Sequence, residues 1–194
     1  RINGIIGLFL VFLVLAVFLN VGVSFWVAMG IPVSLMGTLM LLPFFDVELD
    51  SLTMAAMVLV IGIIVDDAIV VAENIFQHRE KGESPLEAAV NGLHEVALPV
   101  FTTVATTILA FIPLFFIKGM IGKFVFVIPL TVSVSLTMSL LESNFILPAH
   151  LLPRLSSRKQ QNVGRGWFRP IRKRFEELLY RMLELRYMWL FLAI

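Results

Sequence analysis

The sequence predicts an all-α integral membrane protein, a polytopic bundle of transmembrane helices with one amphipathic helix at the membrane surface. Of the 194 residues, 59% are hydrophobic and 15% are charged, whereas a soluble domain carries about 25% charged residues. Residues 2–45 contain no Asp, Glu, Lys or Arg. One helix of that length would measure about 66 Å, roughly twice the hydrocarbon core of a bilayer, so the segment must fold back. This composition excludes a soluble enzyme, a nucleic-acid-binding domain and a disordered tail.

Three transmembrane spans are predicted in the first part of the chain. The polar, glycine-containing segment 20–24 divides the first uncharged run into two spans, and the acidic turn 46–50 separates the second span from the third. The expected spans are therefore about 5–19, 25–45 and 51–76.

Two further spans are predicted after a polar loop. Ser84, Pro85 and Glu87 have the spacing of a helix start, with Ser as N-cap, Pro at the first position and Glu completing a capping box. That helix begins polar and then becomes apolar. We expect the fourth span at about 87–117 and the fifth at about 124–147, closed by Pro148.

The segment after the fifth span is first polar and then amphipathic. Residues 154–166 have few large apolar side chains and are predicted to form a cytoplasmic loop. In 167–184 apolar residues recur at steps of three and four, which is typical of a helix lying in the membrane surface; a helix packed on a soluble domain is the alternative. Residues 185–194 are predicted to start a sixth span. Because the chain lacks an initiator Met and stops inside this span, we expect it to be a piece of a longer protein.

The distribution of lysine and arginine predicts the orientation of the spans. The loop 77–87 contains two of these residues and the segment 148–186 contains ten. The opposite ends of the spans carry only Arg1, Lys118 and Lys123. Because cytoplasmic loops are enriched in Lys and Arg, we expect 77–87 and 148–186 to face the cytoplasm.

Two adjacent carboxylates, Asp66 and Asp67, lie inside the third span. They are roughly 23 Å from its start, past the membrane midplane. A charged carboxylate there costs about 3 kcal/mol or more, and two neighbours also repel each other. Burial and repulsion favour protonation, and the pair is expected to titrate as a coupled unit. A proton-loading site needs these properties.

The acid pair has two other interpretations. The acids could pair permanently with basic residues and lock helices together, but no Lys or Arg lies within another span, so the partner would be outside this chain. They could also lie in a loop, but residues 68–71 continue the apolar run. Relay of protons or of another cation is the interpretation that the sequence favours.

Other polar residues could accompany the pair. Glu73 lies seven residues after Asp66 on the same helical face and is either an inner step of a proton path or a solvated interfacial acid. Glu142 is expected to reach the membrane interface or to pair with a neighbour. A stripe of hydroxyls on the fourth span serves either helix–helix hydrogen bonding or a water path; its members are Thr102, Thr103, Thr106 and Thr107. The histidines do not converge and there are no cysteines, so we expect no metal site and no cofactor.

Residues 62–74, which contain the acid pair, resemble the aspartate-pair helix of the resistance–nodulation–division (RND) transporters. The resemblance is closest to the hydrophobe/amphiphile multidrug exporter branch, and it extends over essentially the whole chain. Asn74 ends this motif and is counted with Glu73 and the threonines among the possible accessory residues. Further segments that resemble the family are 98–103, 111–114 and 119–122.

The resemblance implies twelve transmembrane helices in two repeats, two large periplasmic domains and a homotrimer in the bacterial inner membrane. It also implies a periplasmic adaptor and an outer-membrane channel as partners. The chain would extend from the second transmembrane helix to the start of the seventh. A lysine and hydroxyl residues opposite the acid pair would belong to the second repeat, which is absent here.

The function implied is proton antiport rather than enzyme catalysis: Asp66 and Asp67 would relay protons in exchange for exported drugs or other amphiphiles. The metal-exporting RND branch is one alternative. A non-pumping membrane scaffold, or a protein-export accessory of the same superfamily, is another.

Overall fold

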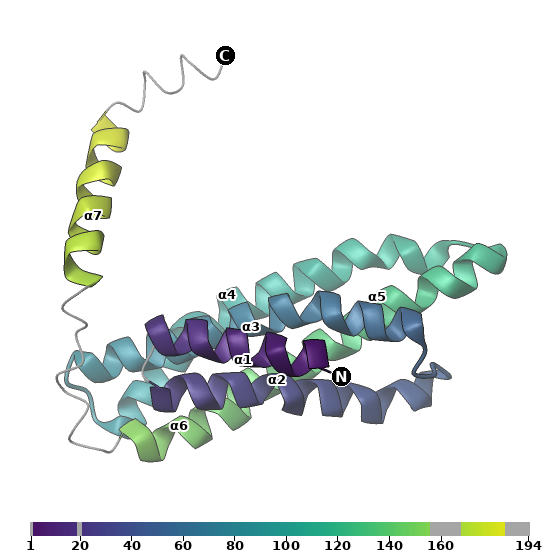
Figure 1. Ribbon diagram of the computed structural model, residues 1–194, viewed down its shortest axis with the longest axis horizontal. Coiled ribbons are helices and arrows are strands. Elements are labelled where there is room, and N and C mark those ends of the chain that lie inside the picture. Colours follow the sequence, from purple (N-terminus) through teal and green to yellow (C-terminus); the bar gives the residue numbers. More distant parts are fainter. Residues whose placement is uncertain (1, 19–20, 156–167, 185–194) are drawn as a thin grey trace. The chain divides into compact units, whose positions relative to one another are not determined.

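The computed structural model describes residues 2–18, 21–155 and 168–184, and the regular elements of these residues are all helices (Figure 1). The chain divides into two units, Arg1–Arg158 and Lys159–Ile194. The first unit contains α1 (Ile2–Phe18), α2 (Val21–Leu41), α3 (Ser51–Glu80), α4 (Pro85–Phe111), α5 (Gly119–Leu141) and α6 (Leu147–Leu155). Two 3₁₀ turns, η1 (Leu42–Phe45) and η2 (Ile112–Phe116), extend α2 and α4, and a π-helical turn, η3 (Glu142–Ile146), joins α5 to α6.

Four of the described helical segments are long and apolar enough to cross a membrane. They are Gly22–Phe45, Ser51–Glu80, Pro85–Phe116 and Gly119–Pro153. The predicted all-α membrane class is therefore confirmed. Helix α1 covers the first expected span and has 17 residues. Helix α2 begins at Val21, so residues 21–24 of the expected break at 20–24 are helical. Residue 20, nearly all of the loop 154–166 and the whole of 185–194 lie outside the described residues.

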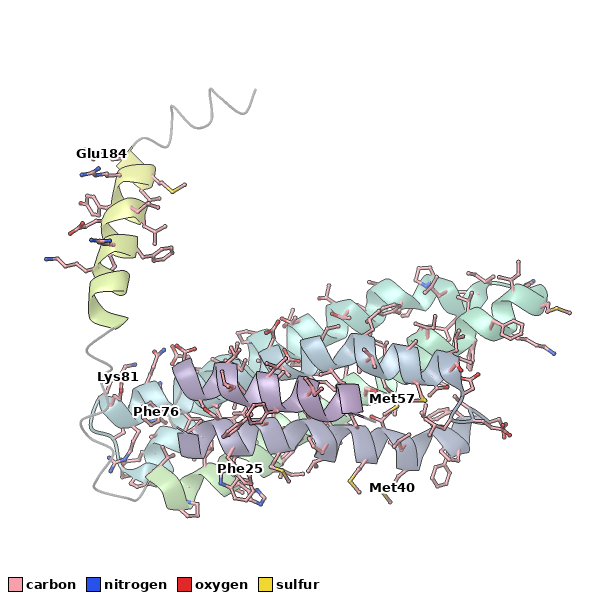
Figure 2. All side chains as sticks on the ribbon, in the orientation of Figure 1. Phe25, Met40, Met57, Phe76, Lys81 and Glu184 are labelled. Atoms are coloured by element: carbon pink, nitrogen blue, oxygen red, sulfur yellow. The ribbon has the colours of Figure 1, made fainter. Side chains whose placement is uncertain are left out.

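Helix α3 packs against α2, α4, α5 and α6, and Figure 1 shows it among the helices of the first unit. Figure 2 shows Met57 towards one end of α3 and Phe76 towards the other, with Lys81 in the turn beyond it. Helix α2 runs the opposite way, from Phe25 to Met40. The two helices are therefore antiparallel, as the short connection between them requires.

Two hydrophobic clusters fill the interior of the first unit. One cluster, here called the α6 cluster, lies at the end of the bundle that contains α6. Its members include Val27, Ala68, Val71, Val100, Leu147 and Leu151. The central cluster includes Ile31, Val60, Ile64, Val104, Val132 and Leu136. Each cluster draws on α2, α3 and α4, so burial of apolar side chains holds these helices together at two levels.

Polar side chains fix the starts of two long helices. The Ser84 hydroxyl accepts from the Glu87 N–H at 3.3 Å, and the Glu87 carboxylate accepts from the Ser84 N–H at 3.0 Å. The capping box predicted from the sequence is thereby confirmed. Asp50 caps α3, because its carboxylate accepts from the Thr53 N–H at 2.7 Å.

The expected end of the fifth span at Pro148 is wrong, since the chain continues as helix α6 to Leu155. In a regular α-helix a proline lacks the N–H donor and clashes with the carbonyl four residues earlier. That residue, Asn144, belongs to the π turn η3. The π turn replaces the regular α-helical hydrogen-bond pattern just before the proline, so the helix continues past Pro148.

Helices α3 and α4 approach closely at Gly92. A Cβ added to Gly92 would lie 2.6 Å from the Cα and 2.8 Å from the backbone nitrogen of Ile75. The side-chain amide of Asn74 donates to the Gly92 carbonyl at 2.8 Å. Glycine is therefore required at this position for backbone contact between the two helices.

Gly92→Ala is expected to destabilise the bundle by about 1–3 kcal/mol, because the added Cβ must push α3 away from α4. Gly62→Ala in α3 is the matched control: it gains the same helix propensity, and its Cβ would meet nothing within 4 Å. Thermal unfolding of the chain in detergent, followed by circular dichroism, measures both variants. An unchanged Tm for Gly92→Ala would contradict the close packing.

Helix α7 (Phe168–Glu184) is the described helix of the second unit. Its described side chains are exposed, and large apolar residues such as Phe175, Leu179 and Met182 follow one another at helical spacing between charged residues. The helix predicted at 167–184 is confirmed as a helix. Its position in a membrane surface stays a prediction.

Candidate functional site

Asp67 is a buried acid in the middle of α3. Its side chain is 6% exposed, and its Oδ2 atom has no hydrogen-bond partner among the described residues. A buried polar group without a partner costs free energy. A proton on the carboxyl removes the charge and lowers that cost.

Asp66, by contrast, is exposed on the outer face of α3. Gly62, Val70 and Glu73 lie on the same face at helical spacing and are also exposed. Adjacent residues of a helix point about 100° apart, so the two acids have different surroundings. In a membrane, a charged side chain faces protein or water rather than lipid. The face that carries Asp66 therefore needs a partner beyond the described residues.

Asp67 lies in a boundary layer between the two hydrophobic clusters. The clusters meet between Val27 and Ile31 on α2, Ile64 and Ala68 on α3, Val100 and Val104 on α4, and Leu136 and Leu147 on α5 and α6. We define the boundary layer as the segments between these residues: 28–30, 65–67, 101–103 and 137–146. It contains the buried side chains of Asp67, Ser139 and Glu142.

Glu142 is the second buried acid of the boundary layer. It is 4% exposed, and its Oε2 atom has no hydrogen-bond partner in the described part of the chain. The carboxylate rests on Gly30 of α2, where an added Cβ would lie 2.7 Å from each oxygen. Glu142 was expected to reach the interface or to pair with a neighbour; its burial does not fit the first of these expectations. Because the helix continues past Pro148, residue 142 lies inside the bundle rather than at its end.

A stripe of buried hydroxyls leads along α5 to Glu142, and sequence analysis missed it. Thr131, Ser135 and Ser139 are each fully buried, and their hydroxyls have no hydrogen-bond partner among the residues described. Steps of four residues, followed by three to Glu142, place the four side chains on one helical face. The signal was present in the sequence as polar residues at helical spacing within an apolar span.

The threonines predicted on the fourth span do lie together on α4. Thr102, Thr103 and Thr106 are exposed. Their hydroxyls, and that of Thr107, donate to carbonyls four residues earlier in α4 at 2.7–3.0 Å. Within the described ranges these hydroxyls do not bridge to another helix.

The two accessory candidates on α3 differ in their contacts. Glu73 is exposed and accepts from the Gln77 side chain at 3.3 Å. Asn74 donates to the Gly92 carbonyl and, at 3.2 Å, to the Glu95 carboxylate. Asn74 therefore joins α3 to α4.

A polar cluster around His78 lies at the end of the bundle where α3 turns into α4. The Nδ1 and Nε2 atoms of His78 lie 2.8 Å and 2.9 Å from carboxylate oxygens of Glu83 and Glu95. Two carboxylate partners fit the charged imidazolium, in which both nitrogens donate. The hydrogen bond from His78 holds the pKa of Glu83 below its usual range. The described residues contain no group of three or more His, Asp or Glu side chains able to hold a metal ion.

The fold and the site define a class of protein. It is a polytopic α-helical membrane protein that keeps carboxylates inside its spans, and such carboxylates mark ion or substrate pathways in membrane proteins. The sequence model of the AcrB/AcrD/AcrF family matches residues 1–194. The chain belongs to this family of RND efflux transporters, which are secondary transporters and not enzymes.

A curated relative agrees with the family match. The chain is similar to multidrug resistance protein MdtC of Photorhabdus laumondii subsp. laumondii, with 35% identity over 163 residues. The alignment covers 82% of this chain and 16% of the relative. The chain thus spans about a sixth of the length of that relative. The RND family predicted from the sequence is confirmed.

Proposed function

We propose that this chain is part of the proton-translocating transmembrane domain of an RND pump that exports drugs or other amphiphiles in exchange for protons. The observation that carries the proposal is Asp67, a buried acid without a described partner in the middle of a membrane-length helix. Family membership supports transport, and similarity to a multidrug resistance protein supports drugs as the exported class.

The two acids have complementary roles in this proposal. A carboxyl group in a bilayer is tolerated when it is protonated or when a cation faces it. Asp67 faces the interior of this bundle, whereas Asp66 faces outward, where the second repeat of an RND transporter would bring its lysine. Loading protons from the periplasm neutralises the pair, and releasing them inward restores the charge.

The change of charge is what drives movement. Neutral acids allow α3 to pack against apolar surfaces, whereas ionised acids need a cation or water, so the two states favour different helix positions. Each proton that crosses supplies about 2.3 kcal/mol per 100 mV of membrane potential. The helix movement would act on periplasmic domains that bind the exported compound.

The location and partners also belong to the proposal. As an RND family member, the full-length protein would be a homotrimer in the bacterial inner membrane. It would work with a periplasmic adaptor and an outer-membrane channel. Its small partners are protons, and its remaining cation would come from its own second repeat.

Dye efflux tests the pump assignment against its alternatives. The full-length protein is produced in bacteria that lack their own multidrug pumps, and ethidium efflux is followed by fluorescence. A proton-coupled drug pump extrudes the dye until a protonophore dissipates the proton gradient. A metal exporter protects the cells against metal ions without moving dye, and a scaffold does neither.

The proposed orientation puts the α3–α4 turn and residues 148–186 in the cytoplasm. The turns at 46–50 and 118–123 would then face the periplasm. This orientation rests on the excess of Lys and Arg in 77–87 and 148–186.

Cysteine labelling is expected to reproduce this orientation. The chain has no native cysteine, so single cysteines can be introduced and treated with an impermeant thiol reagent in intact spheroplasts, in a full-length protein freed of other cysteines. Cysteines replacing Glu48 and Lys118 should react, and those replacing Lys81 and Arg165 should react only after the membrane is permeabilised. The reverse pattern would overturn the orientation.

A further inference from the structure

The boundary layer holds a second acid that the proposed mechanism does not use. Glu142 enters it from the junction of α5 and η3, and Asp67 enters it from α3, which packs against both of these elements. Each acid is buried, and each has a carboxyl oxygen without a hydrogen-bond partner in the part of the chain described. Two buried acids at one level of a bundle are costly unless they serve a purpose.

We propose that Glu142 is a second proton-binding site, which takes the proton from Asp67 and passes it towards the α6 end of the bundle. This inference rests on the proposed function, because it extends the proton path that begins at Asp67. In the transfer the Asp67 carboxyl loses its proton and becomes a carboxylate, and the Glu142 carboxylate becomes neutral. Release of that proton at the α6 end returns Glu142 to the carboxylate form.

The backbone around Glu142 leaves space for its carboxyl group inside the bundle. Gly30 leaves the space that the two oxygens occupy, since a Cβ there would lie 2.7 Å from each of them. The π turn η3 begins at Glu142 itself, and π turns inside helices occur frequently at functional sites.

The charged groups around Glu142 leave its ionised form poorly compensated. Helix α2 contains no titratable residue, and neither does α4 from residue 96 onward. Near this level helix α3 contributes the acids Asp66, Asp67 and Glu73. His78, Arg79 and Glu80 follow at the end of α3, where Arg79 Nε donates to the Leu155 carbonyl of α6 at 2.9 Å. On α6 the basic group that interacts electrostatically with Glu142 is His150. Its Nδ1 lies 2.9 Å from the Ile146 carbonyl oxygen, and its ring packs at a tilt against Trp26 with centroids 4.3 Å apart. Glu142 therefore has acids on the α3 side and a titratable base on the α6 side.

A hydroxyl is available to connect the two acids. Ser139 lies one turn before Glu142 on the same face of α5, and it is fully buried with no partner for its Oγ among the described residues. A hydroxyl can donate one hydrogen bond and accept others, so it can take part in a hydrogen-bonded chain that carries a proton. In this path the proton passes from Asp67 through Ser139 to Glu142. His150 lies at the end of the path where the proton leaves the bundle.

Infrared difference spectroscopy of the full-length protein in lipid tests the site directly. Protonated carboxyl groups absorb separately from carboxylates, and their band shifts in D₂O. Between neutral and acidic pH we expect two components, one lost in Glu142→Gln and the other lost in Asp67→Asn. Glu80→Gln, which removes an exposed acid at the end of α3, is the matched control and should lose neither. A Glu142→Gln spectrum identical to that of the unmodified protein would overturn the proposal.

Gly30→Ala provides a second test that keeps the titratable group. Its Cβ must displace the Glu142 carboxyl, so the Glu142 component should shift in frequency and in pH midpoint, while the Asp67 component stays. If neither component shifts, the described contact between the Glu142 carboxyl and Gly30 is contradicted. This variant also decides the matter if Glu142→Gln fails to accumulate in the membrane.

Ethidium efflux separates failure of this inference from failure of the proposed function. Loss of proton-coupled efflux in both Asp67→Asn and Glu142→Gln, with Glu80→Gln unaffected, supports both. Loss in Asp67→Asn with full efflux in Glu142→Gln overturns only the role of Glu142. Full efflux in Asp67→Asn overturns the relay assignment itself.

Discussion

Replacing Asp67 by asparagine is expected to abolish efflux by the full-length protein while leaving its membrane insertion intact. The substitution removes a titratable group without changing the side-chain volume much, so α3 can no longer alternate between charged and neutral states. Asp66→Asn is expected to have the same effect, because the outward acid would face the cation of the second repeat. Ethidium accumulation in a pump-deficient strain measures the loss, and immunoblots of the membrane fraction report the amount of protein.

Asp46→Asn is the matched control for these variants. Asp46 is exposed in the turn before α3 and has a positive φ of 55°, a conformation that asparagine adopts readily. Its efflux should equal that of the unmodified protein. Retained efflux in both Asp66→Asn and Asp67→Asn would rule out the acid pair as the relay.

The chain alone, without a second repeat, is not expected to conduct protons. In the four membrane-length helices that the structure describes, the Lys and Arg residues are Arg79 and Lys123, each within five residues of a helix end. Neither lies at the level of Asp66 and Asp67 to serve as a permanent cation when they ionise. The acids should stay protonated, or the bundle should self-associate or admit water to shield them. In either case the two acids cannot alternate between a charged and a neutral state.

Liposomes that contain the purified chain and an internal pH dye measure this directly. An imposed pH gradient should decay no faster than in empty liposomes, and a protonophore added at the end should collapse it. Robust proton flux that disappears in Asp66→Asn would mean that the partner repeat is dispensable.

Much of the fold could be predicted because local signals in the sequence are strong. Charge-free runs predicted helices of membrane length, and Ser84 and Glu87 predicted a capping box that the structure contains. Pro148 is the exception, because a π turn just before the proline lets the helix continue. A rule about proline in regular helices does not anticipate that turn.

The site was only partly predictable, because it depends on packing between helices. Position in the span identified Asp66 and Asp67, but it could not show that one acid points into the bundle and the other away from it. That difference depends on which helices pack against α3. The burial of Glu142 was not predicted, because it depends on the continuation of the helix past Pro148. It also depends on the space beside Gly30, which is far away in sequence.

The most direct test of the account is the coupling of proton movement to dye transport in proteoliposomes that contain the full-length protein. An internal pH probe and ethidium fluorescence are recorded together after a pH gradient is imposed. The account predicts that the unmodified protein moves protons when dye is transported, and that Asp67→Asn moves neither protons nor dye. Dye-dependent proton movement in Asp67→Asn equal to that of the unmodified protein would contradict the central claim.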